Sequence, residues 1–358
     1  IIIKTEGKEM KFGIFHLMPR RRVEKAVPEI YADSVEQTRV AEELGFDIAW
    51  FAEHHFSNYC MCPSPLVMAA YFASQTKSIR LGTACLVTPL YNPARMLEEI
   101  GMVDNLTNGR LVVGLGSGYQ NYEFERFDVK LEQAKEMFRE SLDIYEMAFS
   151  SSEYQYEGEF YQIPKAPLSI SPVQPEIPET WITGLSDSPE MMKRIAEKGY
   201  TPFATAGPRN ASSLLSVKER WKEKYNEVGK DPEEMPFAIQ RNLFISDNPT
   251  EVRQAADSIR YTARVATSMR NRTQRLNGNM LEEFPADGEL SLEEIEANAL
   301  IGDAQKCTDQ LISEIEEIRP THISLFVQFG DIPQSQVMHS LDKFGETVLP
   351  QVQQHFPN

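Results

Sequence analysis

Two adjacent histidines beside a glutamate are the residues of this sequence best suited to acid–base chemistry. Glu53, His54 and His55 follow the apolar run 46–51 and precede Phe56. Imidazole titrates near neutral pH, so a histidine can act as a general acid or base, and a nearby carboxylate can orient it. If the segment is extended, successive side chains alternate, so Glu53 and His55 share one side while His54 takes the other. Alternation therefore favours one histidine, rather than two, at a reaction centre.

Two imidazoles near a carboxylate also resemble a metal centre, and a purely structural histidine pair is a further alternative. Alternation argues against a metal, because all three side chains converge only if the chain turns. Of the other histidines, only His16 is placed to complete such a site. Cys60 and Cys62 form a C-x-C pair, but no second pair stands at zinc-site spacing. We predict no metal site.

Two glycine-containing segments could bind a cofactor. The turn from Gly184 to Ser188 leads into Pro189, where free backbone N–H groups at a helix start attract phosphate. An ordinary connection between a strand and a helix would look the same. The segment from Gly114 to Gly118 lacks the G-x-G-x-x-G spacing, so it does not indicate a dinucleotide fold.

The elements that must position these residues alternate between short β-branched or aromatic runs and longer amphipathic stretches, a pattern typical of a parallel sheet. The predicted strands are 11–17, 47–52, 78–86, 110–115, 180–183, 201–205, 237–245 and 322–327. The predicted helices are 34–44, 65–76, 93–106, 131–149, 189–198, 210–228, 250–264, 303–318 and 334–349. Eight strands, each followed by a helix, predict a (β/α)8 TIM barrel, with a doubly wound open sheet as the competing architecture.

The expected barrel is a single domain over residues 10–350 with insertions after strands four and seven. The first, 153–163, is predicted as a surface hairpin. The second, 268–300, is polar and long, which is typical of a lid or a disordered connection. Residues 1–9 precede Met10 and are interpreted as a cloning remnant or a frayed extension.

The charge balance bears on partners and location. The 358 residues include 53 acidic and 36 basic side chains, a net charge of −17 that disfavours nucleic acid and acidic membranes. The apolar runs are too short to cross a bilayer and no secretory pattern is visible, so we expect a cytoplasmic protein. Four irregularly spaced cysteines argue against a disulfide framework.

Taken in order, several segments resemble the bacterial luciferase-like flavin-dependent monooxygenases, a TIM-barrel family. The matching segments are 10–15, 41–47, 53–56, 81–84, 93–95, 104–110, 114–119 and 301–303. The resemblance implies reduced FMN supplied by a separate NAD(P)H:flavin reductase, and O2 that forms a C4a-peroxyflavin. One oxygen atom would then enter a small, hydrophobic organic substrate. It also implies a homodimer formed through the helices near strands two and three.

The resemblance assigns roles to individual residues. His54 matches the family's catalytic histidine, with Glu53 beside it. The phosphate turn falls on Gly184, Leu185, Ser186 and Ser188, and Ala84-Cys85 matches a non-proline cis peptide under the flavin ring. Gly116, Ser117 and Tyr119 complete the expected cofactor site.

Two positions depart from luciferase. Ser117 stands where luciferase has a phosphate-binding arginine, a departure that could weaken phosphate binding or be compensated by Arg95 or one of residues 20–22. Gly116 stands in place of a reactive cysteine, which predicts more room over the flavin. The alternatives to this function are an oxidoreductase of the same fold that uses coenzyme F420, and a flavin-binding protein without catalysis.

Overall fold

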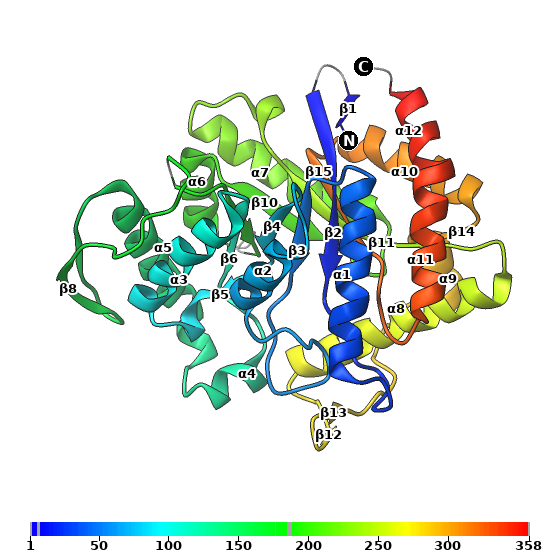
Figure 1. Ribbon diagram of the computed structural model, residues 1–358, viewed down its shortest axis with the longest axis horizontal. Helices are drawn as coiled ribbons and strands as arrows, with labels where there is room; N and C mark the ends of the chain where they lie inside the picture. The colour runs from blue at the N-terminus through cyan, green and yellow to red at the C-terminus, as the bar shows by residue number, and fades with distance from the viewer. Residues whose placement is uncertain (1, 6–7, 176, 185–187, 357–358) are drawn as a thin grey trace.

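Eight parallel strands close into a barrel in the computed structural model, which describes residues 2–5, 8–175, 177–184 and 188–356 (Figure 1). In barrel order they are β2 (Lys8–His16), β3 (Ile48–Phe51), β4 (Arg80–Thr83), β6 (Leu111–Gly116), β9 (Thr180–Thr183), β10 (Thr201–Thr205), β11 (Ala238–Ile245) and β15 (His322–Phe326). Closure comes from the pairing of β15 with β2, in which Phe326 lies opposite Phe15. The predicted (β/α)8 barrel is therefore confirmed, and the open sheet is wrong.

Large aromatic side chains fill the barrel interior. The rings of Trp50 and Trp181 lie 4.4 Å apart, and Phe203 packs against both. Gly82 makes room for this cluster, because a Cβ there would collide with the Trp50 ring. A filled interior leaves chemistry to the carboxyl ends of the strands, as is usual for this fold.

The outer layer consists of helices that follow the strands. It comprises α1 (Val27–Glu43), α2 (Pro65–Ala73), α3 (Pro93–Thr107), α5 (Ala134–Ser150), α6 (Pro189–Lys198), α7 (Leu215–Glu227), α10 (Ala304–Ile318), α11 (Gln334–Lys343) and α12 (Leu349–His355), with a π-helical turn at Phe344–Val348. Single 3-10 turns lie at Thr88–Leu90, Leu131–Gln133, Ala211–Leu214 and Pro232–Glu234. Ser64 and Asn92 cap α2 and α3, each followed by a proline in the first helical turn. None of the described helices has the length and apolar character needed to cross a membrane.

Helix α8 (Pro249–Arg270) departs from the expected ring. Its Tyr261 hydroxyl lies 3.1 Å from Asn58 Nδ2, in the loop after β3, and its Asp257 binds Arg21, in the loop after β2. These loops lie at the carboxyl ends of the strands, so α8 runs across that end of the barrel, in the lower part of Figure 1 above the β12–β13 hairpin. The helix predicted at 250–264 is therefore confirmed, but it lies over the mouth of the barrel, and α10 packs in the outer layer instead. Both helices are amphipathic, and periodicity does not tell which surface an apolar stripe covers.

Both predicted insertions have regular structure. The first is the expected hairpin, formed by β7 (Tyr154–Glu157) and β8 (Gln162–Ala166). The second contains the small hairpin of β12 (Leu276–Asn277) and β13 (Met280–Leu281), helix α9 (Leu292–Asn298) and strand β14 (Leu300–Gly302), which pairs with β11. Residues 2–5 also differ from the frayed extension that was expected, because β1 (Ile2–Thr5) pairs antiparallel with β2 and Ile3 is buried.

Candidate active site

His54 lies just beyond the carboxyl end of β3, where its ring sits between two tyrosines. Its Nδ1 atom is 3.0 Å from Oε1 of Glu123, and its ring meets the Tyr59 and Tyr119 rings edge to face at 4.7 and 5.9 Å. The side chain is 12% exposed, and Nε2 makes no hydrogen bond to any residue that the structure describes. One imidazole nitrogen is therefore fixed by the protein while the other is available to a ligand.

Glu123, the partner of His54, is a site residue that the sequence reasoning missed. It belongs to α4 (Asn121–Arg126), a short helix that follows β6, and its carboxylate is 3% exposed. The same oxygen also accepts a hydrogen bond of 2.8 Å from the backbone N–H of His55. The sequence signal was an acidic residue in the first turn of a helix, directly after the loop at 116–119.

Glu53 points away from His54, toward His55 and the segment that contains Val87 and Tyr91. Its Oε1 lies 2.9 Å from His55 Nε2, while Oε2 accepts from the Tyr91 hydroxyl at 2.8 Å and from the Val87 N–H at 3.2 Å. Burial, followed by the nearby Glu53 charge, raises the pKa of Tyr91. The predicted alternation is thus present, with Glu53 and His55 on one side and His54 on the other. Glu53 orients His55, and Glu123 is the carboxylate that reaches His54.

The remaining histidine considered for a metal site, His16, faces the helical layer. Its Nε2 lies 2.8 Å from the Thr38 hydroxyl, and its ring stacks on Phe51 at 5.7 Å. Burial lowers the pKa of His16 to about 3, so this imidazole is neutral at physiological pH. Within the described part of the chain, no cluster of three potential metal ligands is present.

The Ala84-Cys85 peptide is cis, as the family resemblance implied. Cys85 leads into β5 (Leu86–Val87), which pairs with β6. The Cys85 sulfur and the Thr183 hydroxyl occupy the space into which a Cβ at Gly116 would project. The expectation that Gly116 leaves extra room is therefore wrong, because a neighbouring thiol fills that space. Burial raises the pKa of the Cys85 thiol to about 12, so it stays protonated near neutral pH.

The loop after β6 brings Tyr119 over His54, and Gly118 permits this path. Gly118 has a φ of +75°, and a Cβ there would lie 2.6 Å from both Phe124 and Val87. A side chain at this position would push α4 away from the barrel, and Glu123 with it. Ser117 is half-buried in the same loop.

The predicted phosphate turn is only partly described. Leu185 and Ser186 lie outside the described residues. Gly184 has a φ of +76° and open space around its Cβ position. Ser188 is the N-cap of α6, yet its hydroxyl caps no backbone N–H among the described residues. The hydroxyl and the start of α6 thus remain suited to an anion.

The arginines proposed to replace a phosphate-binding charge are engaged elsewhere. Arg95 is 81% exposed and pairs with Glu99. Arg20 donates to backbone carbonyls in its own loop, and Arg22 pairs with Asp331. Arg21 binds the carboxylates of Asp257, Glu283 and Asp331. The structure therefore gives no support to the idea that one of these arginines replaces the phosphate-binding charge.

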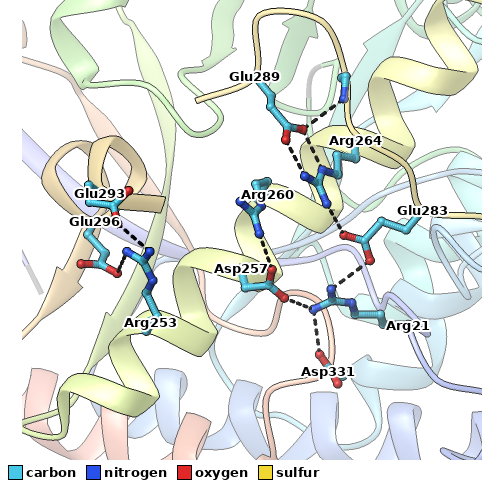
Figure 2. Close-up of polar contacts among 11 residues, drawn as sticks. Arg21, Arg253, Asp257, Arg260, Arg264, Glu283, Glu289, Glu293, Glu296 and Asp331 are labelled. Atoms are coloured by element: carbon cyan, nitrogen blue, oxygen red, sulfur yellow. Dashed lines mark hydrogen bonds and ion pairs between the residues drawn. The ribbon is translucent and has the colours of Figure 1, made fainter. Parts of the chain in front are cut away.

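An ion-pair cluster fastens α8 and the following segment over the mouth of the barrel (Figure 2). Arg21 lies 2.8 Å from Asp257, 2.9 Å from Glu283 and 3.2 Å from Asp331. Arg264 of α8 binds the other oxygen of Glu283, and also Glu289. The cluster therefore joins the loops after β2 and β15 to α8 and to residues 283–289.

Asn58 adds an uncharged anchor for the β12–β13 hairpin. Its backbone N–H donates to the Asn279 carbonyl at 2.8 Å, and its Oδ1 accepts from the Leu281 N–H at 2.7 Å. Asn58 lies four residues after His54, so the covering segment is tied directly to the loop that carries His54. Helix α8 and the β12–β13 hairpin therefore cover the mouth of the barrel on the side of β2 and β3.

Comparison with known proteins agrees with this geometry. A sequence model of the luciferase-like monooxygenases matches residues 10–322. The chain belongs to this family. The uncharacterized protein y4vJ of Sinorhizobium fredii is 35% identical over 96% of this chain and 98% of its own length. The oxygenase component of the flavin-dependent trigonelline monooxygenase of Acinetobacter baylyi is 25% identical over 84% of this chain and 85% of its own.

Solved structures show the same fold. The monooxygenase RslO1 of Streptomyces bottropensis superposes with a TM-score of 0.82 at 21% identity, covering 95% of this chain and 99% of that chain. The 3,6-diketocamphane monooxygenase of Pseudomonas putida, in complex with FMN, gives 0.77 at 20% identity over 95% and 98%. An F420-dependent secondary alcohol dehydrogenase gives 0.72 at 19% identity over 96% and 99%. Family membership confirms the expected class of enzyme, a flavin-dependent monooxygenase, while these structures establish the fold.

Proposed function

We propose that this family member is the oxygenase component of a two-component monooxygenase that uses reduced FMN and O2. The observation that carries the proposal is the pair of His54 and Glu123, placed under α8 at the carboxyl end of the barrel. A buried carboxylate that orients an imidazole, whose second nitrogen remains available, is the arrangement expected of a general acid–base group.

His54 is the proton-handling residue in this proposal. An ionised carboxylate only accepts hydrogen bonds, so Glu123 places the hydrogen of the neutral ring on Nδ1. Nε2 then presents a lone pair to the reactants, takes up a proton and returns it. Glu53 acts on His55 and on the β5 backbone, which makes it a support for the loop that carries His54.

The FMN phosphate would be held by the start of α6, with the Ser188 hydroxyl and the open turn at Gly184. The flavin ring would lie toward the Ala84-Cys85 peptide and Gly116. Reduced FMN supplies the electrons that activate O2. Among the described residues the Ser188 hydroxyl caps no backbone N–H, which fits this assignment, because a helix start without its side-chain cap can bind phosphate oxygens.

The reductant would come from a separate NAD(P)H:flavin reductase, in line with the relative described as an oxygenase component. We place the reaction in the cytoplasm, where NAD(P)H is available. The substrate would be a small organic molecule with an apolar part, in line with the buried Tyr59 ring that packs edge to face on His54.

A homodimer is proposed through α2 and α3, which pack side by side. Each presents exposed apolar residues one helical turn apart, a spacing that places them on one face. These residues are Val67 at 68% and Tyr71 at 47% exposure on α2, and Met102 at 43% and Leu106 at 58% on α3. A second copy of the chain would cover this face.

The deciding experiment supplies the purified protein with photoreduced FMN and then with air. A long-lived oxygenated-flavin absorbance, and product formation from a substrate screen with an added flavin reductase, would support the proposal. Tight binding of F420 with hydride transfer and no use of O2 would favour the F420-dependent alternative. Unchanged properties in His54→Ala would favour a flavin-binding protein without catalysis.

A further inference from the structure

Arg270, the last residue of α8, places a positive charge beside the aromatic wall of the site. Its guanidinium carbon lies 5.1 Å from the centre of the Tyr119 ring, and that ring in turn meets His54. The arginine side chain is exposed, so a ligand that enters the mouth of the barrel can reach it.

Arg270 differs from the other arginines of its helix in having no acidic partner among the described residues. Arg253, Arg260 and Arg264 each pair with at least one carboxylate, as Figure 2 shows. Arg270 forms no ion pair with any residue that the structure describes. In a chain of net charge −17, carboxylates are abundant, and a cation kept apart from them at the mouth of a site is suited to an anionic ligand.

The neighbourhood of Tyr119 is polar as well as aromatic. The Tyr119 hydroxyl accepts from Gln120 Nε2 at 3.0 Å, and Gln120 is completely buried. The other amide atom, Gln120 Oε1, is buried without a hydrogen-bond partner among the described residues. An amide oxygen only accepts hydrogen bonds, so Gln120 Oε1 is suited to a donor such as a hydroxyl, and the positive charge of Arg270 is the feature that suits an anion.

From these observations we propose that the substrate carries a carboxylate and that Arg270 binds it. This inference rests on the proposed function and deepens it, since it replaces a purely hydrophobic substrate by one with an apolar body and an anionic end. Arginine suits this task because its planar fork matches a carboxylate with two parallel hydrogen bonds. Anchored there, the substrate body would extend along Tyr119 toward His54.

The test measures binding by calorimetry, so its result is independent of oxygen chemistry. Benzoate, phenylacetate and 3-phenylpropionate are titrated into the FMN-loaded protein, and so are the three matching carboxamides. The variants are Arg270→Ala, Arg270→Lys and Arg272→Ala. Arg272 is the matched control, because it is an exposed arginine two residues away that already pairs with Glu132.

We expect at least one carboxylate to bind the wild-type protein more tightly than its amide does. Arg270→Ala should weaken that carboxylate by about tenfold to a hundredfold, the scale of a charge-assisted hydrogen bond, and leave the amide unchanged. Arg270→Lys should recover part of the loss, and Arg272→Ala should have no effect. Equal losses in Arg270→Ala and Arg272→Ala would overturn the proposal, as would the absence of carboxylate binding to the wild type.

A second arm separates the substrate from the cofactor as the source of the anion. FMN and riboflavin differ by the phosphate, so their affinities are compared in the wild type and in Arg270→Ala. Unchanged affinities for both flavins support a substrate carboxylate. A loss for FMN alone would overturn the assignment and make Arg270 a phosphate ligand. If oxygenation fails but carboxylate binding depends on Arg270, the proposed function is wrong while the anion site stands.

Discussion

The Nδ1 atom of His54 lies 3.0 Å from Oε1 of Glu123, a carboxylate 69 residues later in the chain. One residue follows the second strand of the barrel, the other follows the fourth, and Gly118 allows the connecting loop to bring them together. The orientation of the imidazole therefore depends on Glu123.

Glu123→Gln should lower the rate of oxygenated product formation by about a hundredfold, the usual scale for an acid–base group that loses its orientation. The amide keeps the size of the side chain, but it can donate to Nδ1 and so allow the hydrogen to move to Nε2. The rate is measured with reduced FMN in excess, together with FMN affinity, which should stay within about threefold. Wild-type turnover in Glu123→Gln would remove this residue from the mechanism.

Glu53→Gln is the matched comparison, because Glu53 is equally buried and binds the other histidine. Glutamine keeps one of the two oxygens, so either His55 Nε2 or the Tyr91 hydroxyl and the Val87 N–H loses its acceptor, and we expect a lower midpoint of thermal unfolding. At a temperature where the variant is folded, its turnover should fall far less than that of Glu123→Gln. A larger catalytic loss in Glu53→Gln would exchange the roles of the two carboxylates.

Much of the barrel was predictable from sequence, because each strand is a short apolar run that borders a distinct turn. β9, β10 and α6 begin and end at the predicted residues. The placement of α8 was not predictable, since an amphipathic stripe at 250–264 is compatible with a ring helix or with a roof. Glu123 could not be predicted for a related reason. Its role depends on a contact between two loops, and no local sequence pattern indicates such a contact.

Gly116→Ala tests whether Cys85 fills the space beside this glycine. The added methyl group meets the Cys85 sulfur and lies 2.7 Å from the Thr183 hydroxyl, so we expect a loss of about 1–3 kcal/mol in unfolding free energy. Cys85→Ala removes the sulfur, and the double variant should recover part of the loss. Strictly additive effects of the two changes, measured by urea unfolding, would show that the side chains do not interact.

His16 should make the protein less stable in mild acid. Its pKa is about 3 in the fold because burial disfavours the charged ring, against an ordinary value of 6.5. The unfolded chain therefore binds the extra proton first, so this contribution is complete above pH 6.5 and is lost as the pH falls toward 3. Between pH 7 and 5 the unfolding free energy of the wild type should drop about 2 kcal/mol more than that of His16→Gln. Equal drops would contradict a buried neutral imidazole.

Leu106→Asp should convert the proposed dimer to a monomer. Leu106 is 58% exposed on α3 beside α2, and a charge there would be buried without a partner if two copies met on this face. Light scattering after gel filtration measures the mass. Val23→Asp is the control, since Val23 is 57% exposed but lies in the loop after β2. A wild-type monomer, or a dimer that persists in Leu106→Asp, would exclude this interface.

Arg21→Met should loosen the covering segment while leaving the barrel intact. Arg21 is 18% exposed and holds Asp257, Glu283 and Asp331 together, so its removal leaves three carboxylates facing one another. Hydrogen exchange of residues 271–291 should become at least about tenfold faster, whereas the barrel strands keep their protection. Arg22→Met is the control, because Arg22 is 72% exposed and its ion pair with Asp331 should contribute little. Repulsion among the remaining carboxylates is screened by salt, so 0.5 M NaCl should restore part of the protection in Arg21→Met. Identical exchange in Arg21→Met and Arg22→Met would mean that Asn58 and apolar packing, rather than the ion cluster, hold the segment in place.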